Sequence, residues 1–211
     1  MAIQVQGNGG TTVEADATFR AMRASLRPEE CINWNAIGAT SGAMTGVAAN
    51  GPVFSFRNTG TNLILIHRLQ VGFVTTTAFT TAQALSYAVF RATGFTVSDS
   101  GGTALYTAGQ NKYRTSFTNI SSAPDIRIGS TGAVTAGTRT LDTVSLGIAG
   151  GSSTAVGTSL QPTGLITHDA GDYPVVLAQN EGIVMTNLIA MGAAGVINLH
   201  VNIEYSENTS Y

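Results

Sequence analysis

The chain has 211 residues, of which 43% are hydrophobic and only 10% are charged, and its formal net charge is −2. This composition is sufficient for a sizeable core and argues against disorder, which goes with high charge and few apolar residues. No basic run is present, so a nucleic-acid partner is not expected. The single cysteine, Cys31, excludes an intrachain disulfide and a zinc–cysteine cluster.

The first 17 residues are predicted to form an extended, glycine-rich arm, because they contain little apolar sequence and neither the basic start nor the apolar core of a signal peptide. Residues 19–27 are ambiguous. Phe19, Met22 and Leu26 are spaced for one face of a helix, but an extended strand agrees better with the rest of the chain. Pro28 ends this element.

Strands with period-two alternation follow. Residues 52–57 place Phe54 and Phe56 on one face. Residues 62–74 form the longest predicted strand, and 84–91 a further one. The residues expected on one face of the longest strand are Leu63, Leu65, His67, Leu69, Val71 and Phe73, and those expected to point inward from the next are Leu85, Tyr87 and Val89.

The second half of the chain predicts shorter elements. Between residues 103 and 140 we expect short β-like pieces, including 112–117 and 125–128, and the Gly-, Ser- and Thr-rich stretch 147–163 is predicted to be a long surface loop. Residues 182–203 carry no formal charge over a length that could span a membrane. Internal asparagines and glycines interrupt this stretch, so two strands joined near residues 191–195 are expected and no membrane span.

Residues 196–205 give the clearest pattern. Ile197, Leu199, Val201, Ile203 and Tyr205 share one parity, and Asn198, His200, Asn202 and Glu204 share the other. Side chains alternate faces along a strand, so this is a half-buried antiparallel strand. Together the segments predict an all-β fold: a single antiparallel β-sandwich over residues 18–211, jelly-roll-like, with an immunoglobulin-like sandwich as the alternative.

Residues that could carry chemistry are few. His67 is expected to be a satisfied core histidine and His200 a surface one. His168, Asp169 and Asp172 form the one cluster with metal-like residue types, although Asp and Gly are also ordinary turn residues. No nucleophile motif or positioned pair of acids is present. We therefore predict no catalytic residue, no cofactor and no metal, and hence a protein that is not an enzyme.

Three segments together resemble a known family. They are Gln4–Thr11 with Phe19–Arg23 and Arg27–Pro28, then Val53–Arg57, and finally Tyr173–Val184. This combination resembles a family of small tailed-phage proteins of the virion structural class. The resemblance covers most of the chain, but its motifs carry no chemistry, so it indicates a lineage rather than a mechanism.

Within that lineage, the resemblance implies a head decoration (cement) protein that binds the major capsid protein on the virion surface, with a tail or neck component as the nearest alternative. Such a role fits a weakly charged surface, which is better accommodated in an assembly than in a free monomer. We expect a homo-oligomer, a trimer by analogy, and expect Arg20, Arg23 and Arg27 to contact acidic capsid residues because Arg forms bidentate contacts with carboxylates.

Two other classes remain open from the sequence. One is a carbohydrate- or receptor-binding module, in which Trp34 with Tyr87, Tyr106 or Tyr113 would offer a stacking platform. The other is a minor enzyme.

Overall fold

A computed structural model describes residues 33–167 and 174–208, together with the backbone of four two-residue strands before residue 33. The chain divides into two compact units, Met1–Ile32 and Asn33–Tyr211. The predicted boundary between an arm of residues 1–17 and a domain starting at residue 18 lies within the first unit, outside the described residues. In that unit β1 pairs with β2 and β3 with β4, both antiparallel; these strands are Val5–Gln6, Thr12–Val13, Ala15–Asp16 and Ala21–Met22.

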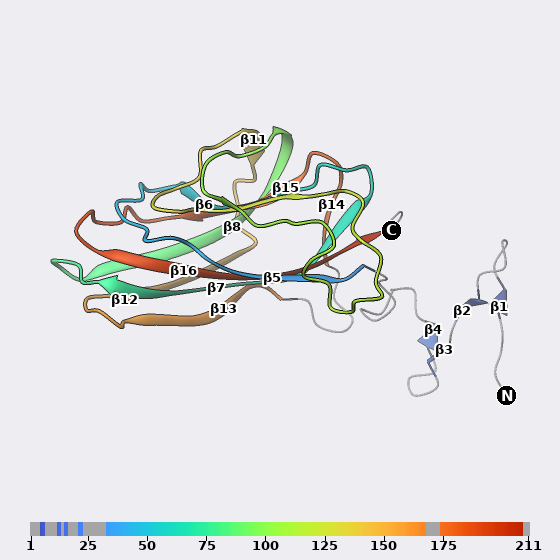
Figure 1. The fold of residues 1–211 in the computed structure, drawn as a ribbon, viewed down its shortest axis with the longest axis horizontal. Coiled ribbons are helices and arrows are strands. Elements are labelled where there is room, and N and C mark those ends of the chain that lie inside the picture. Colours follow the sequence, from blue (N-terminus) through green and yellow to red (C-terminus); the bar gives the residue numbers. More distant parts are fainter. Residues whose placement is uncertain are drawn as a thin grey trace. The chain divides into compact units, whose positions relative to one another are not determined.

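The second unit is a β-sandwich of two antiparallel sheets, and its described residues contain no helix (Figure 1). The predicted all-β antiparallel sandwich is therefore confirmed. Its strands are β5 Asn35–Thr40, β6 Gly51–Arg57, β7 Leu63–Thr77, β8 Gln83–Val97, β9 Thr103–Ala104, β10 Asp125–Ile128, β11 Thr138–Leu141, β12 Gly147–Ser153, β13 Ser159–Thr167, β14 Val175–Leu177, β15 Gly182–Asn187 and β16 Val196–Asn208.

The two sheets share one plan. The seven-stranded sheet has the order β11–β8–β15–β6–β10–β9, with β12 as the seventh strand beside β8. The five-stranded sheet has the order β13–β7–β16–β5, with β14 as the fifth strand beside β7. In each sheet a 15-residue strand has two short partners along one edge. The strand β8 pairs with β12 through its first half and with β11 through its second, and β7 pairs with β14 and then with β13. The edges of the sandwich are thus divided where one short partner ends and the next begins.

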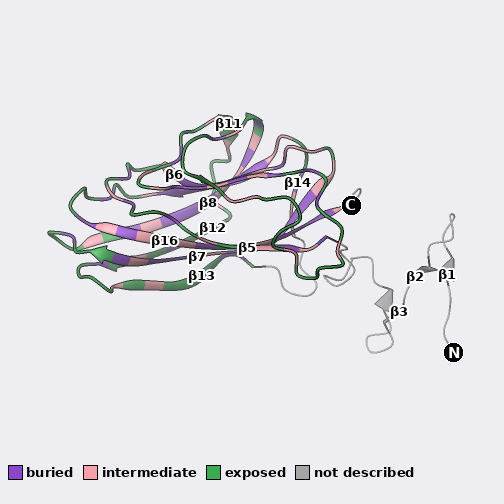
Figure 2. Cartoon of the chain, viewed as in Figure 1, coloured by how far each residue is buried: buried purple, intermediate pink, exposed green. Residues whose placement is uncertain are grey.

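The core lies between the sheets and is built from alternate residues of the strands (Figure 2). On β16 every second residue from Ile197 to Tyr205 is buried, as predicted, and Asn202 on the opposite face is exposed. Leu85 and Tyr87 of β8 are buried in the same core, also as predicted. The period-two pattern therefore identified the inward faces of these two strands.

The face prediction for the first half of β7 is wrong. Ile64 and Ile66 join the main core in place of Leu63 and Leu65. Beyond them the core residues of β7 are Leu69, Val71 and Phe73. The register of β7 with β16 explains the change. Glu204 lies opposite Arg68 and Tyr205 lies opposite Ile66, so His67 is the extra residue of a β-bulge. A bulge inverts the alternation on either side of it.

The prediction of a long loop over residues 147–163 is also wrong. This stretch forms β12 and the first part of β13, which are joined by residues 154–158. Strand β12 pairs with β8 at seven consecutive positions, although its Gly and Ser residues have low strand propensity. A neighbouring strand explains one of these glycines: a Cβ on Gly147 would clash with the carbonyl oxygen of Leu165 on β13. Close approach of the two backbones therefore requires glycine here.

Of the two short pieces named between residues 103 and 140, one is a strand. Residues 125–128 form β10, as expected. Residues 112–117 do not form a strand, and Lys112 makes only an isolated bridge to Asn35 of β5. Residues 105–124 instead form a long connection between β9 and β10.

A smaller apolar cluster, separate from the main core, contains Phe95 with Ala92 and Val184. The Arg139 guanidinium lies 5.1 Å from the centre of the Phe95 ring and forms an ion pair with Asp99. The Arg139 and Asp99 side chains are 5% and 1% exposed. Burial lowers the pKa of Arg139, but a guanidinium stays charged in proteins. The Asp99 carboxylate therefore has to balance a buried positive charge.

Candidate interaction surface

The residues proposed from the sequence for contacts or metal binding lie largely outside the described part of the chain. This holds for Arg20, Arg23 and Arg27, and also for His168, Asp169 and Asp172. His200 is described, and it lies on the outer face of β16 as expected, with its Nδ1 atom 3.1 Å from the Thr40 hydroxyl.

Three large apolar side chains stand out on the surface near β12. Val144, Leu146 and Ile148 are 75%, 44% and 61% exposed. We call these three residues the apolar stripe. They have the same parity, and the chain containing them runs along the edge of the seven-stranded sheet, where Ile148 lies opposite Ala88 of β8. Single exposed apolar residues are ordinary, whereas a contiguous set often marks a contact surface.

The sequence contains a signal for the apolar stripe. Val144, Leu146 and Ile148 alternate with Thr143, Ser145 and Gly147, which is the pattern of a strand. That pattern predicts a strand but would have placed the apolar face in the core. Only Ile148 of the three lies in β12, which begins at Gly147, and it points outward because Ala149 is the β12 residue that joins the core.

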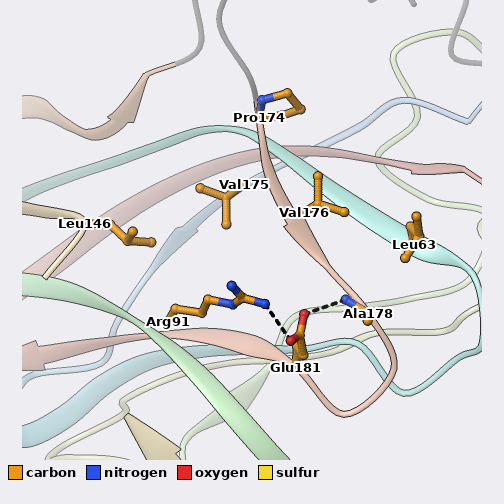
Figure 3. A pocket seen from close by; sticks show the side chains of 8 residues that line it. All are labelled: Leu63, Arg91, Leu146, Pro174, Val175, Val176, Ala178 and Glu181. Carbon is orange, nitrogen blue, oxygen red and sulfur yellow. Dashed lines mark hydrogen bonds and ion pairs between the residues drawn. The ribbon is translucent and has the colours of Figure 1, made fainter. Parts of the chain in front are cut away.

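An open pocket of about 570 Å3 adjoins the apolar stripe, and Leu146 belongs to both (Figure 3). It lies between β14 with the start of β7, the middle of β8 and the segment before β12. Its apolar lining comes from Leu63, Leu146, Pro174, Val175, Val176 and Ala178, and its charged lining from Arg91 and Glu181. The pocket therefore adjoins the apolar stripe at Leu146.

The two charged groups in the pocket neutralise each other. A guanidinium nitrogen of Arg91 lies 2.6 Å from a carboxylate oxygen of Glu181, and the other oxygen accepts the Ala178 backbone N–H at 2.9 Å (Figure 3). Neither carboxylate oxygen is therefore left without a donor. An ion pair satisfied in this way offers a binding partner little net charge, so the pocket favours apolar contacts over a charged ligand.

A buried asparagine fixes the rim of this pocket. Asn58 is fully buried, and its amide nitrogen donates to the carbonyl oxygens of Asn62 at 2.7 Å and Leu177 at 3.0 Å. Its side-chain oxygen accepts the Gly60 N–H at 3.0 Å. One side chain thus ties the start of β7 to the end of β14. A rim held in this way loses less conformational entropy of its own when a partner docks.

The aromatic residues considered for carbohydrate stacking are only partly brought together. Tyr87 is buried in the core, so it is not available. Tyr113 is 57% exposed and meets Trp34 edge-on at 5.9 Å. One face of Trp34 is already stacked on His67 at 4.0 Å. An open, flat platform of several rings is therefore not formed by these residues.

Within residues 33–167 and 174–208, no three or more His, Cys, Asp or Glu side chains lie close enough together to hold a metal ion. The same part of the chain contains no helix with the length and hydropathy of a membrane span.

Comparisons with known protein families, curated proteins and solved structures found no match to this chain.

Proposed function

We propose that this chain is a non-enzymatic structural protein of a tailed-phage virion, specifically a capsid decoration (cement) protein that binds the major capsid protein on the outer surface of the shell. The resemblance of three segments to virion structural proteins supports this proposal. The β-sandwich is compatible with it, because a decoration protein needs a rigid scaffold that presents its edges to neighbours.

The strand order supports the jelly-roll form of the sandwich. One sheet contains β5–β16–β7–β13 and the other contains β12–β8–β15–β6. Most successive strands of this set lie in opposite sheets, as in the double Greek key of a jelly roll. Jelly rolls occur in viral capsid proteins and also in lectins, so the fold supports a virion role only by analogy.

The observation that carries the proposal is the apolar stripe with its adjoining pocket on a chain that is only 10% charged. Apolar surface concentrated at a sheet edge favours association with another protein. In a shell the same modest contact is repeated many times. Repetition increases the overall avidity without requiring one strong site.

The proposal includes a homo-oligomer, a trimer by analogy with virion jelly rolls, and attachment through residues 1–17 with Arg20, Arg23 and Arg27 at their base. An extended segment can add to a free sheet edge of a neighbour through backbone hydrogen bonds. The arginines would then pair with acidic groups on the capsid.

Purified particles provide the test of location. A shell component is expected in roughly hundreds of copies per particle, whereas a tail or neck component repeats about six or twelve times, following the closed symmetry of those structures. Absence of the protein from particles would refute the virion assignment, and a low copy number would replace the shell by the tail or neck.

Co-sedimentation with particles lacking this protein tests the surface. The double variant Leu146→Ser/Ile148→Ser should bind more weakly than the unchanged chain, because it removes apolar contact area. The matched control is Val97→Ser/Val156→Ser, which alters two other exposed valines, 55% and 65% exposed. Equal binding by both double variants would show that the apolar stripe is not the attachment surface.

A further inference from the structure

A buried acid near the end of β16 is surrounded by hydrogen-bond donors. Glu207 is 7% exposed. Its carboxylate accepts the backbone N–H groups of Ser121 at 2.9 Å and Ser122 at 2.8 Å, and it also accepts both serine hydroxyls. The Asn33 amide nitrogen lies 3.4 Å from the same carboxylate. Every contact made by the two carboxylate oxygens is with a donor, as an ionised carboxylate requires.

This carboxylate connects three segments that are distant in sequence. Asn33 is the first residue of the sandwich unit, and its side-chain oxygen accepts the Glu207 backbone N–H at 2.8 Å. Ser121 and Ser122 belong to the 105–124 connection between β9 and β10. Glu207 itself belongs to β16. The side chain and backbone of Glu207 together attach the start of the sandwich and the long surface connection to the last described strand, and the Thr59 hydroxyl also donates to the Ser122 carbonyl at 2.6 Å.

No described cation pairs with this carboxylate, since none of the ion pairs in residues 33–167 and 174–208 includes Glu207. The titratable groups of the surrounding elements make other contacts. Tyr106 donates to the Ile120 carbonyl at 3.3 Å, and His67 lies 2.8 Å from the hydroxyl of Ser206, next to Glu207 in β16. Lys112 donates to the Phe117 carbonyl at 2.8 Å, and Tyr205 packs against Phe56 in the core. The hydrogen bonds are therefore what holds the ionised form in place.

We propose that Glu207 is an acid-operated latch: its ionised form holds the 105–124 connection on the sandwich, and protonation releases that connection while the two sheets stay packed. Protonation removes the negative charge that strengthens the hydrogen bonds from the Ser121 and Ser122 backbone N–H groups. These N–H groups cannot turn into acceptors for the new O–H, as the serine hydroxyls can. Local release costs less than global unfolding because such a connection can open as a separate unit.

The direction of the pKa shift gives the pH range. Burial by itself raises the pKa of Glu207, but hydrogen bonds from Ser122 and Ser121 outweigh burial and lower it below its ordinary value of 4.5. A group with a lowered pKa in the folded state stabilises that state fully above its unfolded pKa. That contribution is lost as the pH falls through the lower folded pKa. The latch is therefore closed at neutral pH, and it opens only in acid below the ordinary pKa of a glutamate.

The chain contains its own reporter of this opening. Trp34 is the single tryptophan, its carbonyl accepts the Tyr113 backbone N–H at 3.1 Å, and the two rings touch. Tyr113 belongs to the 105–124 connection, so release of the connection removes it from Trp34 and changes the tryptophan emission. Lys112 and Arg114 in the same connection are sites for trypsin.

The experiment compares the full unchanged chain with Glu207→Gln and with the matched control Glu204→Gln, which neutralises an acid on the outer face of the same strand. Trp34 emission and far-ultraviolet circular dichroism are followed from neutral pH to strong acid. The unchanged chain and the control should show an emission change in acid, below the ordinary pKa of a glutamate, with the strand signal retained, and Glu207→Gln should lack it. At neutral pH trypsin should cut Glu207→Gln at Lys112 or Arg114 about tenfold faster, because cleavage tracks the open population.

Two outcomes would overturn the proposal. One is an acid transition that survives in Glu207→Gln, which would assign it to another group such as His67. The other is loss of the strand signal together with the emission change in the unchanged chain, which would mean global unfolding. If Glu207→Gln does not fold, the double variant Ser121→Ala/Ser122→Ala keeps the acid but removes both hydroxyl donors. It should move the emission midpoint to higher pH, and an unmoved midpoint would also refute the latch.

Discussion

Truncation of Leu199 to alanine tests the core of the sandwich directly. Leu199 is fully buried on β16, opposite Phe73 of β7, and its backbone is hydrogen-bonded to Ser41. The change removes roughly three methylene equivalents at ~0.8 kcal/mol each, or about 2.4 kcal/mol of transfer free energy. Paired strands on both sides of β16 hinder collapse into the cavity, so the free energy of unfolding should fall by about 3–5 kcal/mol.

The neighbouring His200→Ala variant is the control. Its side chain lies on the opposite face and makes one exposed contact of 3.1 Å with the Thr40 hydroxyl, so its loss should cost about 1 kcal/mol or less. Urea unfolding should show a lower midpoint for Leu199→Ala at an unchanged slope. Equal losses for the two variants would refute the face assignment of β16.

Two further predictions concern charge and the N-terminal segment. Asp99→Ala should lower the free energy of unfolding in urea by about 3–5 kcal/mol, because it leaves Arg139 buried without its counter-charge. Glu204→Gln breaks an ion pair with the half-exposed Arg68 and should lower it by less than about 1 kcal/mol. Similar losses would mean that burial does not decide how much these pairs stabilise the fold. Deleting residues 2–17, which can reach ~55 Å at ~3.3 Å per residue when extended, should leave the melting temperature nearly unchanged but weaken co-sedimentation with particles lacking this protein. An unfolded deletion variant would place this segment in the core, and undiminished binding would place attachment elsewhere.

The sequence predicted the fold class because its strongest strands bury one face. Residues 196–205 alternate without a break, so their faces were assigned correctly. In β7 the alternation is interrupted by a bulge at His67, and the bulge depends on pairing with residues more than 130 positions away. Local periodicity cannot indicate where such a register shift occurs.

Composition misled the interpretation of β12, because Gly and Ser indicate a loop when no neighbours are known. Its strand state depends on seven pairs with β8 and on close approach to β13. The candidate surface was missed for a related reason. Alternation at Val144, Leu146 and Ile148 predicts a strand, but the strand begins only at Gly147, and the pattern does not say which face meets solvent. The Glu207 site was also not predictable, since its donors are 85 to 174 residues away.

The strand order has a consequence for synthesis of the protein. In both sheets a late strand lies between two early ones: β15 between β6 and β8, and β16 between β5 and β7. Synthesis proceeds from the N-terminus at ~5–20 residues per second, so for several seconds the early strands lack the partners that join them. Neither sheet can close until its late strand has left the ribosome. Nascent chains stopped before residue 182 would lack the middle of both sheets and should depend on chaperones to avoid aggregation.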